Sequence, residues 1–233
     1  MAVTGLVHHF GTFMLFSAVI LLVITNITAP VVHNISLLRI DLNDAQGQHN
    51  PALTFGTFGH CFVDAPGGDD CSPSMVGYDP AEVINERTGL NYYSTAAGTA
   101  RALTRVMILH PIAAGVAFIA FALSLGAGTF GSLLASLAAL LAFFVTLVPL
   151  VTDFVMFGII RSGINDNRNV DARAQFGTGL WTLLAAAVLL LVGTVIVFFT
   201  CCSARIHRRR DARVTKAVDG YAPAEAPRRR KWF

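Results

Sequence analysis

Four long apolar runs constrain the fold of this chain more than any other feature of its sequence. A helix needs about 20 residues to cross a hydrocarbon core about 30 Å thick, and each run is about that long or longer. A helix on the surface of a soluble core would carry a polar stripe at intervals of three and four residues, and these runs have none. The sequence therefore predicts an all-α membrane protein built on a bundle of four transmembrane helices. The runs are Phe10–Ile27, Val106–Leu125, Leu133–Ile160 and Leu180–Phe199.

The first apolar run has a second interpretation, because a cleaved signal peptide is also apolar and N-terminal. This run is not preceded by Lys or Arg, and it is longer than the apolar part of an ordinary signal peptide. Only a weak cleavage site lies at Thr28–Pro30. We therefore expect the first run to be a retained helix.

Four spans place both termini on the same side of the membrane. The tail after Cys201 carries ten Lys and Arg residues, and the positive-inside rule places such a tail in the cytoplasm. Arg161, Arg168 and Arg173 in the second outer loop oppose this orientation, but the tail has more basic residues. The predicted segments are a cytoplasmic N-terminus (1–9), helix 10–32, extracellular loop 33–105, helix 106–125, cytoplasmic link 126–132, helix 133–160, extracellular loop 161–176, helix 177–200 and a basic, disordered cytoplasmic tail (201–233).

Two of the four cysteines, Cys61 and Cys71, lie in the Gly- and Asp-rich part of the long first loop. Neither has a C-x-x-C partner or a set of regularly spaced histidines nearby, so a disulfide is favoured over free or metal-binding thiols, which remain the alternative. The predicted extracellular location agrees with oxidation, and a ring this short would contribute about 3 kcal/mol. The segment Ala52–Val63, rich in Thr, Phe and Val, predicts one or two short strands within this disulfide-stapled loop.

The other two cysteines, Cys201 and Cys202, follow the fourth apolar run and precede a basic cluster. Juxtamembrane cysteines beside a polybasic segment are candidates for S-palmitoylation, and unmodified thiols are the alternative. We expect the basic cluster to contact anionic lipids of the inner leaflet, with docking of a cytoplasmic partner as the alternative and no role in nucleic-acid binding. The cluster comprises Arg205, Arg208, Arg209, Arg210 and Arg213.

Asp153 is the one acidic residue inside an apolar run, and His110 in the second run is its one potential ionisable partner. An ionisable group at membrane depth suggests a function, although a hydrogen bond to a neighbouring helix is the simpler interpretation. A proton or ion pathway would need more such groups. Three outer-loop histidines, His33, His49 and His60, could also titrate near neutral pH, and direct pH sensing by them is a minor alternative.

The sequence contains no Ser-His-Asp set, phosphate-binding loop or paired metal motif, and this absence favours a protein that is not an enzyme and has no cofactor or metal. Small residues recur at four-residue spacing in the third run, for example Ser132 and Ser136. Such spacing lets helices approach closely, which suits a compact bundle or a homo-oligomer.

Several local patterns together resemble one family. They are the paired outer cysteines, the segment VGYDP at Val76–Pro80, the segment LHPIAAG at Leu109–Gly115 and the run Phe144–Ile164. The chain up to about Cys202 is similar to the fungal PalI family of pH-response regulators, within a wider four-span, claudin-like group that includes eisosome proteins. The Gly-Leu-Trp motif of claudins is only echoed here, by Gly56-Thr57-Phe58, which favours the fungal branch.

The resemblance implies a plasma-membrane accessory component of ambient alkaline-pH signalling. Proteins of this kind assist the localisation or stability of a seven-span, PalH-like pH sensor. An alternative that the resemblance also allows is a structural organiser of plasma-membrane microdomains, as in eisosomes. A channel or transporter is a third possibility, and Asp153 is its only support.

Overall fold

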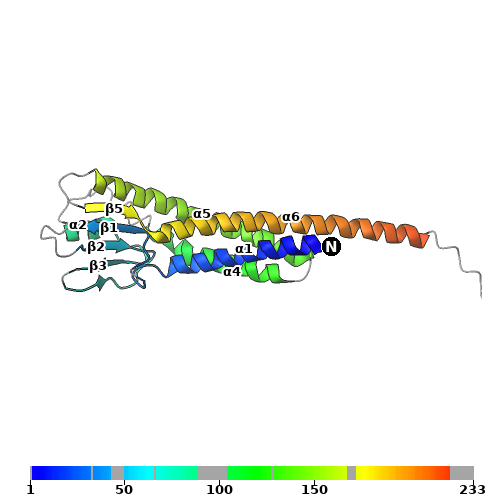
Figure 1. Ribbon diagram of the computed structural model, residues 1–233, viewed down its shortest axis with the longest axis horizontal. Helices are drawn as coiled ribbons and strands as arrows, with labels where there is room; N and C mark the ends of the chain where they lie inside the picture. Colours follow the sequence, from blue (N-terminus) through cyan, green and yellow to red (C-terminus); the bar gives the residue numbers. More distant parts are fainter. Residues whose placement is uncertain are drawn as a thin grey trace, which may run out of the picture.

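The computed structural model describes residues 2–32, 34–42, 50–65, 67–88, 104–126, 129–166 and 172–220. Four long helices lie side by side, and a small β-sheet covers one end of the bundle (Figure 1). All four helices are long and apolar enough to cross a membrane, which confirms the predicted four-span fold. They are α1 (Ala2–Asn26), α4 (Leu109–Leu125, preceded by the 3-10 turn η1, Val106–Ile108), α5 (Thr129–Asn165) and α6 (Thr178–Gly220).

Small side chains let the helices pack closely within the bundle. Helix α1 runs along α6, and α4 runs along α5. A Cβ atom added at Gly11 would lie 2.9 Å from Ile196, and one added at Gly193 would lie 3.0 Å from Leu15. Alanines fill much of the remaining buried interface, where they permit the short interaxial distances typical of membrane bundles. The larger apolar side chains, such as Phe118 and Leu141, are exposed on the surface of the bundle.

Helix α5 continues beyond the length of a single membrane span. Its 37 residues correspond to about 55 Å of helix. The additional turns pack against the sheet, where Phe157, Ile160 and Ile164 are buried. The same helix therefore serves as a membrane span at one end and packs at the other against the sheet and the short helix α2 (Pro80–Thr88). The sheet and α2 form the outer subdomain, so called because they lie on the side predicted to be extracellular.

Helix α6 corrects one prediction, because the segment from Cys201 to Gly220 is helical, whereas we expected disorder from Cys201 onward. This segment is rich in Ala and Arg, which favour helix, and Gly220 is its first Gly or Pro. In Figure 1 this helix projects well past the ends of the other three. The remainder of the tail lies outside the described residues.

The sheet has five antiparallel strands in the order β4-β3-β2-β1-β5, and its last strand comes from the connection between α5 and α6. Residues of β1 pair with β2, for example Leu38 with Phe55, and with β5, for example Leu38 with Phe176. The predicted strand segment Ala52–Val63 contains β2 and β3, and this prediction is confirmed. The strands are β1 (Leu38–Leu42), β2 (Ala52–Phe55), β3 (His60–Val63), β4 (Asp70–Cys71) and β5 (Ala172–Phe176).

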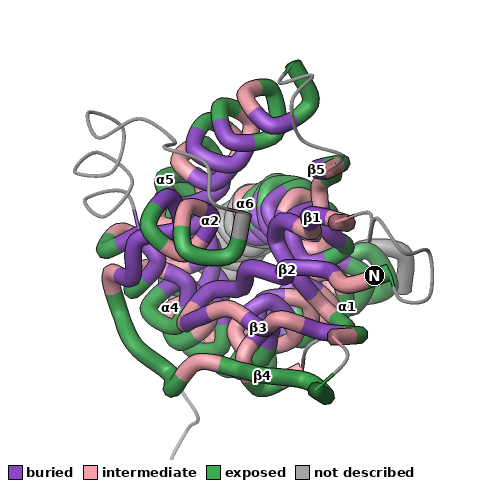
Figure 2. The backbone as a smooth tube through the Cα atoms, turned by 90° about the vertical axis from the view of Figure 1, so that its left-hand side faces the viewer, coloured by how far each residue is buried: buried purple, intermediate pink, exposed green. Residues whose placement is uncertain are grey.

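The two faces of the sheet have different environments, as the alternation of side chains along a strand requires. One face presents Leu38, Leu53 and Phe55 to α5 and to the short helix α2 (Pro80–Thr88). The other face presents Cys61 and Val63 to the turn that follows α1. Burial decreases from β2 toward β4, which forms an exposed edge (Figure 2).

Hydrogen bonds at the turn between β2 and β3 attach the sheet to the end of α1. The Thr57 backbone N–H donates to Thr28 Oγ1 at 2.9 Å, and the Thr57 hydroxyl donates to the Thr25 carbonyl at 2.9 Å. The hydroxyls of Thr25 and Thr182, on α1 and α6, lie 3.2 Å apart directly below. Because these groups are buried and satisfied, they fix the position of the sheet on the bundle.

The β5 edge of the sheet is closed by a side chain from α5. Asn165 Nδ2 donates to the Ala174 carbonyl at 3.0 Å, and the Ala174 N–H donates to Asn165 Oδ1 at 2.9 Å. The amide group thus takes the place of a neighbouring strand, a device that blocks pairing at an exposed edge. Asn165 is also the last residue of α5, so one residue ends the helix and caps the sheet.

Candidate functional site

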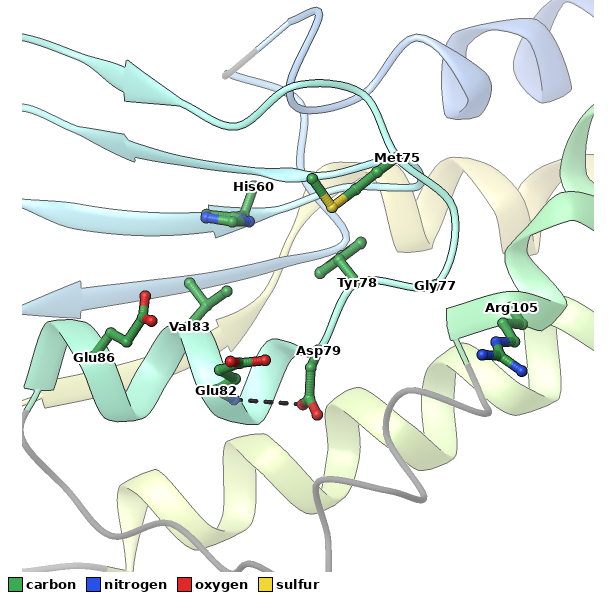
Figure 3. Close-up of a pocket in the computed structure, with 9 residues that line it drawn as sticks. All are labelled: His60, Met75, Gly77, Tyr78, Asp79, Glu82, Val83, Glu86 and Arg105. Atoms are coloured by element: carbon green, nitrogen blue, oxygen red, sulfur yellow. Dashed lines mark hydrogen bonds between the residues drawn. The ribbon is translucent and has the colours of Figure 1, made fainter.

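A pocket of about 360 Å³ opens between the sheet and α2 (Figure 3). Its wall on the sheet side includes His60 of β3, and the segment before α2 contributes Tyr78. The α2 side is acidic, with Glu82 and Glu86, while Arg105 approaches from the start of the second membrane helix. The remaining lining residues are Met75, Gly77, Asp79 and Val83. This pocket combines both signs of charge with one imidazole.

The start of α2 explains why this wall of the pocket is ordered. Asp79 precedes the helix and its Oδ1 accepts hydrogen bonds from the N–H groups of Ala81, at 3.0 Å, and Glu82, at 3.4 Å. Pro80 occupies the first helical position, where a missing N–H costs nothing. The sequence YDPAE therefore encodes a helix start directly beneath Tyr78. An Asp followed by Pro is a helix-start signal that can be read from the sequence alone.

Tyr78 connects the pocket to the membrane helices. Its ring is stacked on Phe55 with centroids 6.3 Å apart, and its hydroxyl donates to the Gly56 carbonyl at 2.7 Å. Its own carbonyl accepts a 2.6 Å hydrogen bond from the hydroxyl of Thr104, which precedes η1. Burial raises the pKa of Tyr78 above its usual range, and the negative charge of Asp153 raises it further. Tyr78 is therefore a fixed, neutral hydrogen-bond donor.

His110 and Asp153 meet below Tyr78, between α4 and α5. His110 Nε2 lies 3.2 Å from Asp153 Oδ2, and the two side chains are 0% and 1% exposed. Sequence analysis singled out both residues, and the structure brings them together. The contact is within hydrogen-bond distance, and His110 Nε2 and both oxygens of Asp153 have no other hydrogen-bond partner among the described residues.

The protonation of His110 follows from its other ring nitrogen. His110 Nδ1 lies 3.0 Å from the Met107 carbonyl, which can only accept, so Nδ1 carries a hydrogen. A second hydrogen between Nε2 and Asp153 Oδ2 would make the pair neutral overall, whether it were on the ring or on the carboxyl group. This neutral state is the one that a water-excluded interface between helices can hold without several kcal/mol of desolvation cost.

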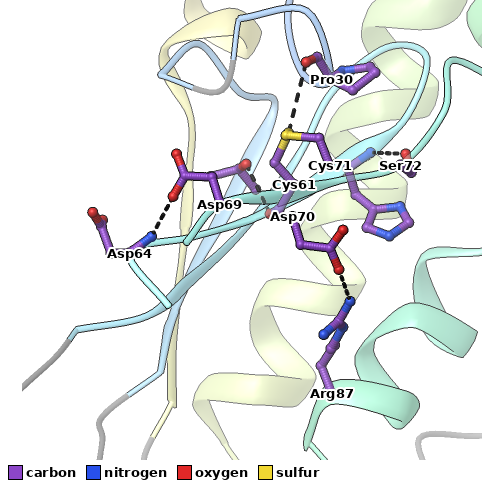
Figure 4. Close-up of a disulfide and its surroundings, with 10 residues drawn as sticks. Pro30, Cys61, Asp64, Asp69, Asp70, Cys71, Ser72 and Arg87 are labelled. Carbon is purple, nitrogen blue, oxygen red and sulfur yellow. Dashed lines mark hydrogen bonds and ion pairs between the residues drawn. A yellow bond between two sulfur atoms is a disulfide. The ribbon is translucent and has the colours of Figure 1, made fainter. Parts of the chain in front are cut away.

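The structure contains the predicted disulfide between Cys61 and Cys71, on the sheet face opposite the pocket (Figure 4). The two residues are direct cross-strand partners in β3 and β4. The sulfur of Cys61 lies 3.9 Å from the Pro30 carbonyl; a disulfide sulfur has no hydrogen to donate, so this is a packing contact. Asp70, next to Cys71, forms a 2.7 Å ion pair with Arg87 of α2.

The predicted cytoplasmic sites differ in accessibility. Cys201 is buried, with 5% of its surface exposed, and Cys202 is half-buried. Cys202 is therefore the better-placed candidate for acylation. The five clustered arginines lie within the helical extension of α6, and their side chains are outside the described part of the chain.

The structure describes some of the remaining sequence candidates and not others. His33 and His49 fall outside the described residues, so of the three outer-loop histidines only His60 is placed. Ser132 and Ser136 both lie buried on α5. Within the described ranges, no three His, Cys, Asp or Glu side chains are grouped to hold a metal ion.

A family model, described as the SUR7/PalI family, matches residues 2–209. The chain belongs to the SUR7/PalI family. It is 29% identical over 112 residues to the pH-response regulator protein palI/prr-5 of Neurospora crassa, and the match covers 48% of this chain and 14% of that relative. It is 29% identical over 154 residues to palI/RIM9 of Pyricularia oryzae, with 62% and 19% covered. For palI/RIM9 of Emericella nidulans the identity is 27% over 116 residues, with 50% and 18% covered.

The family match includes the four membrane helices and every strand of the sheet. The pocket, Tyr78 and the His110–Asp153 pair therefore all lie within the matched region. The chain spans less than a fifth of the length of the SUR7/PalI relatives named above. All three carry the names of regulators, and none has the name of an enzyme.

Acidification is expected to destabilise the sheet of this SUR7/PalI protein through His60. Burial, followed by the charge of Arg87, lowers the pKa of His60 below 6.5, while Asp70 and Glu86 oppose the shift. Since the unfolded chain binds this proton first, the contribution of His60 is complete above pH 6.5 and is lost as the pH falls through the lower folded-state pKa. Thermal unfolding of purified protein at neutral and acidic pH measures this loss.

The matched comparison for this prediction uses two histidine variants. His60→Gln removes the titrating group, so its melting temperature should fall less on acidification than that of the original protein. His9→Gln replaces an exposed histidine of α1 and should leave the pH dependence unchanged. An identical acid sensitivity in His60→Gln and the original protein would show that another group is responsible.

Proposed function

We propose that this protein is a non-enzymatic plasma-membrane component of fungal ambient-pH signalling, which helps a seven-span pH sensor to reach the cell surface or to remain there. The observation that carries the proposal is the family match over residues 2–209, together with relatives named as pH-response regulators. The matched region contains a compact outer subdomain on a membrane bundle. Such an architecture offers two surfaces to a membrane partner, the lipid-facing sides of the helices and the sheet.

The orientation in this proposal places the sheet outside the cell and the extension of α6 in the cytoplasm. The basic residues after Ser203 favour this arrangement under the positive-inside rule. The disulfide supports it independently, because disulfides persist in oxidising compartments and are rare in the cytosol. In this orientation the pocket beside α2 faces the medium whose pH the pathway reports.

The α6 extension is proposed to contact the inner leaflet or a cytoplasmic partner. Its arginines begin two residues after Ser203, within the distance over which anionic lipids attract basic side chains. Acylation of Cys202 would add a second anchor at the same depth. Lateral association, with the sensor or with a second copy of this chain, would use the exposed apolar faces of the helices.

Deletion of the gene tests the proposed function. The deletion strain is expected to grow poorly at alkaline pH and to misplace a fluorescently tagged seven-span sensor, and the full chain should restore both. Normal alkaline growth together with normal placement of the sensor would contradict the proposal. Static membrane patches containing the tagged protein, with membrane or cell-wall defects and no pH phenotype, would instead support the microdomain organiser.

A further inference from the structure

The His110–Asp153 pair lies where the membrane bundle meets the outer subdomain. Met107, three residues before His110, is buried in the same cluster as Phe55 and Tyr78 of the outer subdomain. Phe157, one helical turn after Asp153, belongs to that cluster as well. The pair therefore joins α4 to α5 at the level where both helices support the sheet. A change in the distance between His110 and Asp153 would therefore change how α4 and α5 pack against the sheet.

Loss of the shared proton would leave this site with an uncompensated charge. The Nε2 lone pair of His110 would then face a bare carboxylate, since Nδ1 keeps its hydrogen for the Met107 carbonyl. Neither oxygen of Asp153 has another hydrogen-bond partner among the described residues, and the side chain is 1% exposed. A buried charge in this state is relieved only when water enters or the helices separate.

Few other ionisable groups face this junction. Helix α1 has none between Phe10 and Asn26, and α6 has none between Thr178 and Thr200. Tyr78 stays protonated, and on α5 the next ionisable group is Arg161, two turns away, which lies over the Phe176 ring. The groups beyond Tyr78 line the pocket: His60 on β3, Asp79, Glu82 and Glu86 at α2, and Arg105 before η1.

We propose that the proton shared by His110 and Asp153 is an alkaline-sensitive latch, which holds the outer subdomain firmly on α4 and α5 and loosens that contact when it is lost. Tyr78 lines the pocket and is close enough to Asp153 to be affected by its charge, so the latch lies near the outer solution. The release is a simple acid dissociation: the pair loses one proton to water and gains one negative charge.

The latch goes beyond the proposed function and is tested separately from it. It would give a pH-signalling component a group of its own that responds to alkali. The test of the latch uses the purified full chain. A deletion strain with normal alkaline growth and normal sensor placement would therefore contradict the proposed function without contradicting the latch. A failed latch would equally leave the accessory role in place.

Hydrogen exchange of the full chain in lipid nanodiscs tests the latch. Between about pH 5 and about pH 9, exchange corrected for intrinsic chemistry should increase about tenfold or more in peptides covering residues 76–84 and 104–112, as expected for one linked proton. Asp153→Asn should show little change, because its amide donates a hydrogen to Nε2 and cannot lose it to water. Asp166→Asn, at the exposed end of the same helix, should keep the original profile.

A second measurement uses the tryptophan that contacts the residue following Asp153 in the chain. The Trp181 ring lies 6.1 Å from that of Phe154, the residue after Asp153, so its fluorescence in a Trp232→Phe background should change over the same pH range. Exchange and fluorescence that stay constant from about pH 5 to about pH 9 in the original protein would overturn the proposal, whatever the variants do. Equal pH profiles in Asp153→Asn and the original protein would overturn it as well.

Discussion

Replacing Gly56 by alanine is expected to lower the free energy of unfolding by about 3 kcal/mol, at the upper end of the range for overpacking a buried site. A Cβ atom at Gly56 would overlap the backbone oxygen, nitrogen and carbon of Ala29, which a rotamer change cannot relieve. Neither backbone is free to move. The Gly56 N–H donates to the Gly59 carbonyl at 2.8 Å, and the Ala29 N–H donates to the Ile35 carbonyl at 3.1 Å.

Two other glycines provide matched controls for this prediction. Gly115 on α4 and Gly158 on α5 have open space where a Cβ atom would be placed. Alanine at these positions should leave the stability within about 1 kcal/mol and favour helix formation. Thermal unfolding of the three purified variants in one detergent measures the difference. A Gly56→Ala protein as stable as Gly158→Ala would show that the turn after α1 is not fixed against the sheet.

The membrane helices could be predicted because each apolar run carries its own signal. About 20 apolar residues must be helical in lipid wherever the rest of the chain lies. The β5 strand is different, because ARAQF has weak strand character and pairs with β1 more than 130 residues earlier. Nothing local in Ala172–Phe176 indicates that pairing. The sheet was therefore predicted only where Ala52–Val63 had a strong composition of its own.

The candidate site shows the same division between local and non-local information. Asp153 and His110 were identified from sequence because a polar residue in an apolar run is conspicuous. Their 3.2 Å contact depends on the rotation of α4 against α5, and no periodicity in either helix fixes that rotation. Tyr78 was part of a recognised segment, VGYDP, but its place in the wall of the pocket required the fold.

His60 and the proposed latch affect the outer subdomain in opposite directions as the pH changes. Protonation of His60 weakens the sheet below pH 6.5, whereas loss of the proposed latch proton weakens the junction in alkali. Both groups contact or approach Tyr78, His60 through its ring at 6.0 Å and Asp153 through its charge. With the latch as proposed, the firmly docked state of the outer subdomain would be limited to an intermediate pH range.

Removing the disulfide is expected to increase hydrogen exchange in residues 67–73 about a hundredfold, as about 3 kcal/mol of cross-link stabilisation is lost. Strand β4 has only two residues, both exposed, so little else holds it. The contacts that remain include the Ser72 N–H to His60 carbonyl bond of 2.9 Å and the His60 N–H to Ser72 Oγ bond of 3.1 Å. The exposed Arg87–Asp70 ion pair also remains, and such surface pairs contribute at most about 1 kcal/mol. The variant Cys61→Ala/Cys71→Ser matches the buried and exposed environments of the two positions.

The effect of the disulfide should stay local. Strands β1, β2 and β5 are held by Leu38, Phe55 and Ala174 in the core shared with α5, and their exchange should change little. A reductant should produce the same increase in the original protein and none in the variant, which separates loss of the bond from the substitutions themselves. Increased exchange in Leu38–Leu42 and Ala172–Phe176 as well would mean that the cross-link stabilises the whole sheet. The core shared with α5 would then be insufficient to hold the other strands without the disulfide.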